Sequence, residues 1–161
     1  MNVFIDTEFS SLGSDPRLIS IALVAENGEE LYIEFQSGWK LEQCSSWVRS
    51  NVLPLLGDGE KLDRPAAAVR IHNWLSQFPS LGKIIVDSSW DVELINILFN
   101  ETGVGATKYP IETIKLKNRA EIEIIENLRR KYVLEKQCLK HHALHDARSL
   151  RFAFQKLNLN L

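Results

Sequence analysis

The sequence is poor in cysteine, with only Cys44 and Cys138, and it has no CxxC pair. This scarcity excludes a disulfide framework and a thiolate zinc site, so we expect two reduced thiols. Apolar runs of the roughly 18 residues needed to span a bilayer are absent, as are repeats and low-complexity tracts. Met1 and Asn2 lead into a short apolar segment that Asp6 soon interrupts, unlike a signal peptide. We therefore expect a cytoplasmic protein without a membrane anchor.

The sequence has no large excess of positive or negative charge, and the net charge of −2 does not indicate a nucleic-acid partner. The distribution of charge along the chain is more informative. Residues 1–107 hold 7 Lys/Arg against 15 Asp/Glu, whereas residues 108–161 hold 12 against 6. A basic C-terminal third suits a phosphate backbone beside a cation site, but basic helix surfaces explain it equally well. With 45% hydrophobic residues, the 161 residues fit one domain, 1–161.

Hydrophobic patterning predicts an α/β domain in which helices flank a central, mixed, five-stranded sheet. The turn signal Asn27-Gly28 joins the second and third strands into a hairpin. Asp63 is a good N-cap for the helix that follows it. The expected strands are 3–9, 18–24, 31–35, 83–86 and 107–114, and the expected helices are 63–78, 90–99, 118–132 and 142–157, with helix-like spacing also at 41–56.

Two acids stand at the end of the first strand, where the sequence reads Asp6-Thr7-Glu8-Phe9. Alternation places Asp6 and Glu8 on one face of the strand, with Thr7 and Phe9 on the other. Two carboxylates on one face repel each other unless a cation lies between them, and oxygen ligands of this kind suit Mg²⁺ or Mn²⁺. A solvated strand end explains the pair equally well.

A second acidic segment follows the strand 83–86, where Asp87, Ser88, Ser89, Trp90 and Asp91 open a helix. Ser88 can cap that helix, and Asp91 then falls in its first turn, where the helix dipole favours an acid. Asp87 could equally serve as a ligand at the strand end.

A third acid lies on the last helix. Asp146 shares a stripe with Ala143, Leu150 and Ala153 at helical spacing, so the helix buries it. A buried carboxylate is costly unless it is paired or binds a metal. Three of the four histidines of the chain lie within five residues of Asp146.

Together the three segments resemble the DEDDh 3′-5′ exonuclease superfamily, which has a ribonuclease H-like fold. Asp6 and Glu8 match the DxE motif, Trp90-Asp91 matches the second motif, and His141 with Asp146 matches His-x4-Asp. Asp87 stands where many members carry Asn. The chain looks most like a compact bacterial or phage exoribonuclease of that superfamily. It departs from the DTETTG start of many proofreading members, so the resemblance favours RNA over DNA as the substrate.

The resemblance implies phosphodiester hydrolysis with two divalent cations, Mg²⁺ or Mn²⁺, held by Asp6, Glu8, Asp91 and Asp146. It implies that His141 is the general base. Helix geometry places His142 on the face of Asp146, so His142 remains a rival.

The expected partner is the 3′ end of single-stranded RNA or DNA, contacted by Phe9, Ser10 and Trp90, although core packing is an alternative role for Phe9. Relatives are often homodimers, so a homodimer is possible, and no membrane is involved. A DNA-directed exonuclease and a non-catalytic nucleic-acid-binding domain of the same fold remain alternatives. Candidate phosphate contacts are Lys115, Lys117, Arg119, Arg148 and Arg151.

Overall fold

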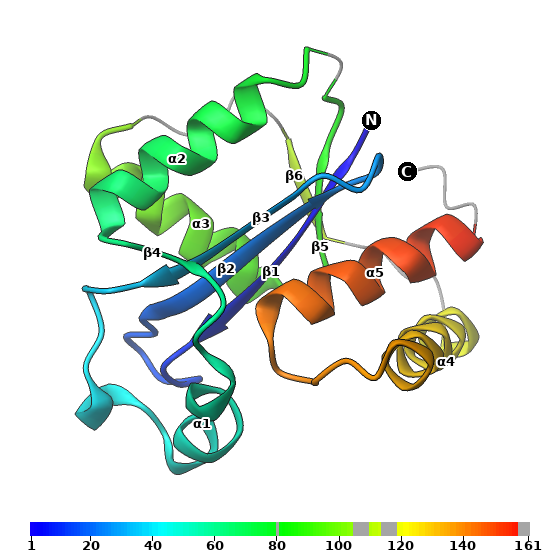
Figure 1. Ribbon diagram of the computed structural model, residues 1–161, viewed down its shortest axis with the longest axis horizontal. Coiled ribbons are helices and arrows are strands. Elements are labelled where there is room, and N and C mark those ends of the chain that lie inside the picture. Colours follow the sequence, from blue (N-terminus) through cyan, green and yellow to red (C-terminus); the bar gives the residue numbers. More distant parts are fainter. Residues whose placement is uncertain (80, 105–109, 114–118, 158–161) are drawn as a thin grey trace.

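A six-stranded mixed sheet forms the centre of the protein, as the computed structural model in Figure 1 shows. The structure describes residues 1–79, 81–104, 110–113 and 119–157. The strand order across the sheet is β4-β3-β2-β1-β5-β6. β1–β2 and β2–β3 pair antiparallel, and the other three pairs are parallel. The strands are β1 (Val3–Phe9), β2 (Leu18–Ala25), β3 (Glu30–Phe35), β4 (Glu60–Leu62), β5 (Ile84–Val86) and β6 (Ile111–Thr113).

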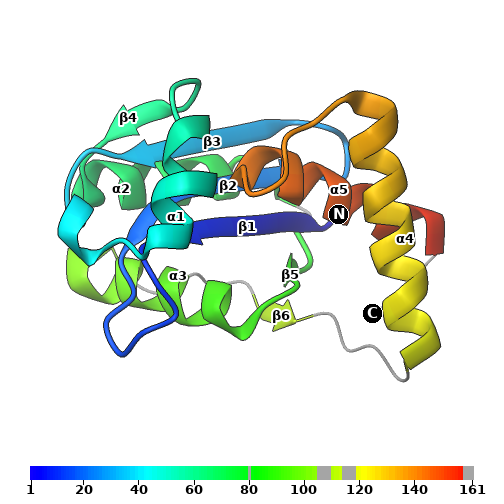
Figure 2. The same cartoon turned by 90° about the horizontal axis from the view of Figure 1, so that it is seen from below.

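Helices cover both faces of the sheet (Figures 1 and 2). One face carries α2 and α3, which enclose the larger apolar core with side chains such as Val3, Ile5 and Ile71. The other face carries α5, with α4 packed on its outer side. The helices are α1 (Ser46–Asn51), α2 (Arg64–Ser76), α3 (Ser89–Thr102), α4 (Arg119–Lys136) and α5 (Ala143–Leu157), and short 3-10 turns cover Leu41–Gln43 and Leu53–Leu55.

The predicted α/β class with a mixed sheet is confirmed, but the strand count of five was wrong. The additional strand β4 pairs parallel with β3, with Ile33 opposite Glu60. Its three residues, Glu60, Lys61 and Leu62, include two exposed charged side chains. A strand this short at a sheet edge has no apolar alternation to reveal it.

Local signals in the sequence set several element boundaries. Gly28 adopts a φ of 96° in the β2–β3 turn, which favours glycine, and its N–H donates to the carbonyl of Ala25 at 2.9 Å. Asp63 caps α2 by accepting from the N–H of Ala66 at 2.9 Å. The segment 41–56 is broken into one short helix and two 3-10 turns, with Pro54 in the second turn. The predicted strand 107–114 corresponds to β6; residue 110 precedes that strand, and 107–109 and 114 lie outside the described residues.

Both cysteines are free, Cys44 buried and Cys138 partly buried. Within the described ranges, no helix has the length and apolar character needed to cross a membrane.

Candidate active site

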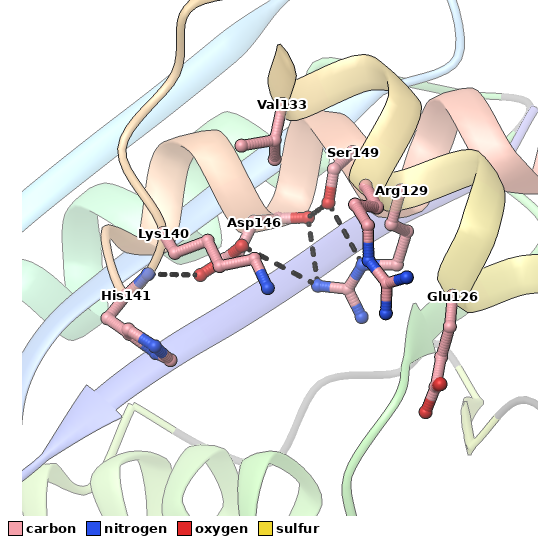
Figure 3. Close-up of a pocket in the computed structure, with 8 residues that line it drawn as sticks. Glu126, Arg129, Val133, Lys140, His141, Asp146 and Ser149 are labelled. Atoms are coloured by element: carbon pink, nitrogen blue, oxygen red, sulfur yellow. Dashed lines mark hydrogen bonds and ion pairs between the residues drawn. The ribbon is translucent and has the colours of Figure 1, made fainter.

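Three carboxylates meet where β1 passes under the first turns of α5. Oxygen atoms of Asp6, Glu8 and Asp146 all lie within 4.8 Å of one another. Alternation along β1 turns Asp6 and Glu8 toward α5, together with Phe4, which packs on Leu150. Asp146 lies on α5, which crosses over β1 (Figure 3). The sequence predicts that two acids of the first strand and one acid of the last helix share a site. In the structure these three acids are neighbours.

Small side chains allow this close approach of α5 to the sheet. Ala143 and Ala147 are fully buried against Ala22 and Val24 of β2. A bulkier side chain at either position would lift the helix away from the strands. The backbone N–H of His141, just before α5, donates to Asp146 Oδ2 at 2.9 Å and orients this carboxylate.

Burial and mutual repulsion raise the pKa of each acid in the cluster. Burial raises the pKa of Glu8 to about 8, and the nearby charges of Asp146, Asp91 and Asp87 add to the shift. Burial and the same neighbours raise the pKa of Asp6 well above its usual range. Burial also raises the pKa of Asp146, opposed by the positive charge of Arg129. Like charges this close need a positive partner, and three carboxylate oxygens suit Mg²⁺ or Mn²⁺.

Asp91 lies beside this cluster, bonded to the middle residue of the DxE segment. It is buried in the first turn of α3. Its Oδ1 accepts from the Thr7 hydroxyl at 2.5 Å and from the Thr7 N–H at 3.1 Å. Burial raises the pKa of Asp91 to about 7, although the bonds from Thr7 lower it. Ser88 caps α3 as expected, by accepting from the N–H of Trp90.

Arg129 of α4 also reaches the site, a contact that no sequence pattern predicts. Its guanidinium forms an ion pair with Asp87. It also donates to Ser149 Oγ at 2.9 Å and to the Asp146 carbonyl at 3.4 Å (Figure 3). Although burial opposes it, the charges of Asp87, Asp6 and Asp146 raise the pKa of Arg129. Arg129 therefore neutralises Asp87.

The two candidate histidines have different surroundings. His141 is partly buried, precedes α5 and stacks edge-on against Trp47, with ring centroids 4.6 Å apart. His142 is buried between Tyr32 and His145, at centroid distances of 4.7 and 4.4 Å. Burial lowers the pKa of His142, and the charge of His145 adds to this shift. Of the two, His141 lines a cavity that Asp146 also lines.

An apolar cavity of about 330 Å³ opens next to Glu8. The pairing register of β1 shifts between Glu8 and Phe9, and both side chains line this cavity despite being adjacent in sequence. The cavity is completed by Ser11, Leu12, Ser45, Trp47 and Val48. Trp47 is 49% exposed. It has no motif around it, so sequence reasoning missed it.

The other predicted substrate contacts lie deeper. Ser10 is fully buried, and its hydroxyl accepts from the N–H of Arg17 at 3.0 Å. Trp90 is partly buried, with its ring 6.0 Å from that of Phe9. Neither residue lines the apolar cavity.

A second cavity, of about 440 Å³, lies between α4 and α5 and is called the basic cavity below. It is lined by Glu126, Arg129, Arg130, Val133, Lys140, His141, Asp146 and Ser149 (Figure 3).

Two of the basic residues proposed from the sequence pair with other parts of the protein and do not line the basic cavity. Arg148 forms an ion pair with Glu30 at 2.5 Å, and Arg151 donates to the Glu26 carbonyl at 2.7 Å. Lys115, Lys117 and the side chain of Arg119 fall outside the described parts of the chain.

Comparison with known proteins gives one partial similarity. Over 56 residues, the chain is 46% identical to the 3′-5′ exoribonuclease Rv2179c of Mycobacterium tuberculosis strain H37Rv and, equally, to the 3′-5′ exoribonuclease MT2234.1 of strain CDC 1551. The match covers 35% of this chain and 33% of each relative, so the chain spans about a third of the length of the curated relatives. No protein-family model matches the chain.

Proposed function

We propose that this protein is a metal-dependent 3′-5′ exonuclease that removes nucleotides one at a time from the 3′ end of single-stranded RNA. The observation that carries the proposal is the meeting of Asp6, Glu8 and Asp146 within 4.8 Å, from two elements far apart in sequence. The partial similarity to proteins named 3′-5′ exoribonucleases supports the same reaction and favours RNA.

The carboxylates of Asp6, Glu8 and Asp146 would hold divalent cations, with Asp91 supporting them from α3. Bound Mg²⁺ or Mn²⁺ would promote deprotonation of water near pH 7 and offset charge on the phosphate. Thr7 fixes the carboxylate of Asp91 through two hydrogen bonds, and the His141 N–H fixes that of Asp146. The chain thus orients two acids before any ligand arrives.

His141 would act as the general base. Its partly exposed ring lies at the edge of the acidic cluster and takes a proton from the attacking water, a role suited to an imidazole. The water oxygen bonds to phosphorus as the bond from phosphorus to the O3′ of the preceding nucleotide breaks. That O3′ leaves with a proton drawn from solvent. The products are a 5′-mononucleotide and a strand shorter by one residue, with a free 3′-hydroxyl.

The apolar cavity would receive the base of the terminal nucleotide. Phe9 and Trp47 offer aromatic surface beside Glu8, and stacking on such a ring contributes about 1–3 kcal/mol per base without reading sequence. The terminal nucleotide would then place its 5′-phosphate at the acidic cluster.

The reaction and its direction can be tested with one single-stranded RNA labelled in turn at each end. In Mn²⁺, the 5′-labelled strand should shorten in one-nucleotide steps, and the 3′-labelled strand should release labelled mononucleotide in the first turnover. A matched DNA should be cut more slowly. Internal fragments or release from the 5′ end would contradict the proposal. Binding of RNA without any product would leave a non-catalytic binding domain as the function.

A further inference from the structure

The basic cavity contains positively charged side chains that form no ion pair within the described part of the chain. Arg129 is neutralised by Asp87. Arg130 and Lys140 also line the cavity, are exposed, and have no ion-pair partner in the described part of the chain. The carboxylates lining the cavity are those of Glu126 and Asp146. The carboxylate of Asp146 belongs to the acidic cluster. The two unpaired positive charges of Arg130 and Lys140 then face the single remaining carboxylate of the cavity lining, that of Glu126.

The position of the basic cavity relates it to the reaction. It shares Asp146 and His141 with the proposed catalytic site, while the apolar cavity shares Glu8 with that site. The acidic cluster therefore borders both an aromatic-lined cavity and a cation-lined cavity. An RNA strand whose terminal base occupies the apolar cavity would then extend from the acidic cluster past Arg130 and Lys140.

We propose that the basic cavity binds the backbone phosphate on the 5′ side of the scissile linkage, between the second and third nucleotides from the 3′ end. This inference rests on the proposed function. Lys140 and Arg130 contact that phosphate directly, because their charged groups are free and line the space beside His141. The subsite reads charge and not sequence, so it acts equally on every base. It makes the enzyme favour substrates with at least two phosphodiester linkages.

The test combines a neutral substrate linkage with a protein variant. An RNA oligomer carries one uncharged methylphosphonate at the second linkage from the 3′ end, and a control oligomer carries it at the sixth. The protein variant is the double substitution R130A/K140A. Its matched control is K131A, because Lys131 lies on α4, forms an ion pair with Glu135 and does not line the cavity. The rate of the first cleavage is measured at limiting substrate.

For the wild type, the methylphosphonate at the second linkage should slow the first cleavage about tenfold, as expected for losing two exposed charge contacts. The methylphosphonate at the sixth linkage should have little effect. On all-phosphate RNA, R130A/K140A should make the first cleavage about tenfold more slowly than the wild type. The methylphosphonate at the second linkage should not slow this variant any further. Equal slowing in K131A, or full sensitivity of the double variant to the neutral linkage, would overturn the proposal.

A binding measurement separates failure of this subsite from failure of the proposed function. Anisotropy of a labelled oligomer in Ca²⁺ reports affinity without requiring turnover. For each lost phosphate contact, the slope of log affinity against log salt should fall by about 0.7. Cleavage by the wild type with no affinity difference between R130A/K140A and K131A would refute the subsite alone. No cleavage by the wild type would refute the exonuclease, and the anisotropy slopes would then decide whether the basic cavity binds phosphate.

Discussion

Replacing Asp6 with Asn should stabilise the cation-free protein while removing its activity. The side chain of Asp6 lies among acids, with oxygens of Glu8 and Asp146 within 4.8 Å. At an effective dielectric constant of about 20, two unit charges at that separation repel by about 3.5 kcal/mol. The wild type relieves part of this repulsion by taking up protons. The expected gain in the free energy of unfolding at pH 8 is therefore smaller, about 1–3 kcal/mol.

The gain should depend on pH in a defined direction. The pKa of Asp6 is raised in the folded protein, so its protonation contributes stability that is complete below the unfolded pKa near 4 and is lost as pH rises through the folded pKa. Asn at this position does not titrate. The difference between Asp6→Asn and wild type should therefore be small near pH 4 and grow toward pH 8, where Glu8 also loses its proton.

Thermal unfolding in EDTA measures this difference. For a domain of this size, about 1–3 kcal/mol corresponds to a rise in Tm of roughly 3–10 °C at pH 8. Millimolar Mn²⁺ should raise the Tm of the wild type more than that of Asp6→Asn, because cation binding to the folded state is stabilising. A variant no more stable than wild type in EDTA at pH 8 would refute the idea of a strained acidic cluster.

Three further substitutions test individual contacts. His141→Ala should lower kcat by about 10²–10⁴-fold, whereas buried His142→Ala should mainly lower Tm; a reversed pattern in steady-state kinetics would make His142 the base. Thr7→Val removes the 2.5 Å bond to Asp91 and should reduce the free energy of unfolding by about 1–3 kcal/mol in urea titrations; no loss would mean that this bond contributes nothing net. Trp47→Ala should raise KM several-fold or more with Tm nearly unchanged, since about half of the side chain is exposed; an unchanged KM would exclude stacking on this ring.

The parts of the fold and site that follow local rules were predictable from sequence. Alternation along β1 placed Asp6 and Glu8 on one face, and 3.6-residue periodicity placed Asp146 on the inner face of α5. These two patterns are sufficient to bring the three acids together once α5 packs on the sheet. The N-caps Asp63 and Ser88 were equally visible, because capping depends on the nearest few residues.

The parts that depend on tertiary packing were not predictable. Arg129 lies on a helix rich in charged residues, where a solvated face is the ordinary interpretation, and only the packing of α4 on α5 brings it to Asp87. Trp47 reaches the site because the short helix α1 lies beside the end of β1, a placement with no local pattern. The turn of Phe9 into the cavity shared with Glu8 coincides with a register shift, which strict alternation does not anticipate.

The central claim is that Asp6, Glu8 and Asp146 form a cation site that drives removal of nucleotides from a 3′ end. The most direct measurement is shortening of a 5′-labelled single-stranded RNA by wild type and by Asp146→Asn, each in Mn²⁺ and in EDTA. The account predicts a one-nucleotide ladder for the wild type in Mn²⁺ alone, and no ladder in the other three reactions with both proteins folded. A ladder that persists in EDTA, or that Asp146→Asn produces at the wild-type rate, would contradict it.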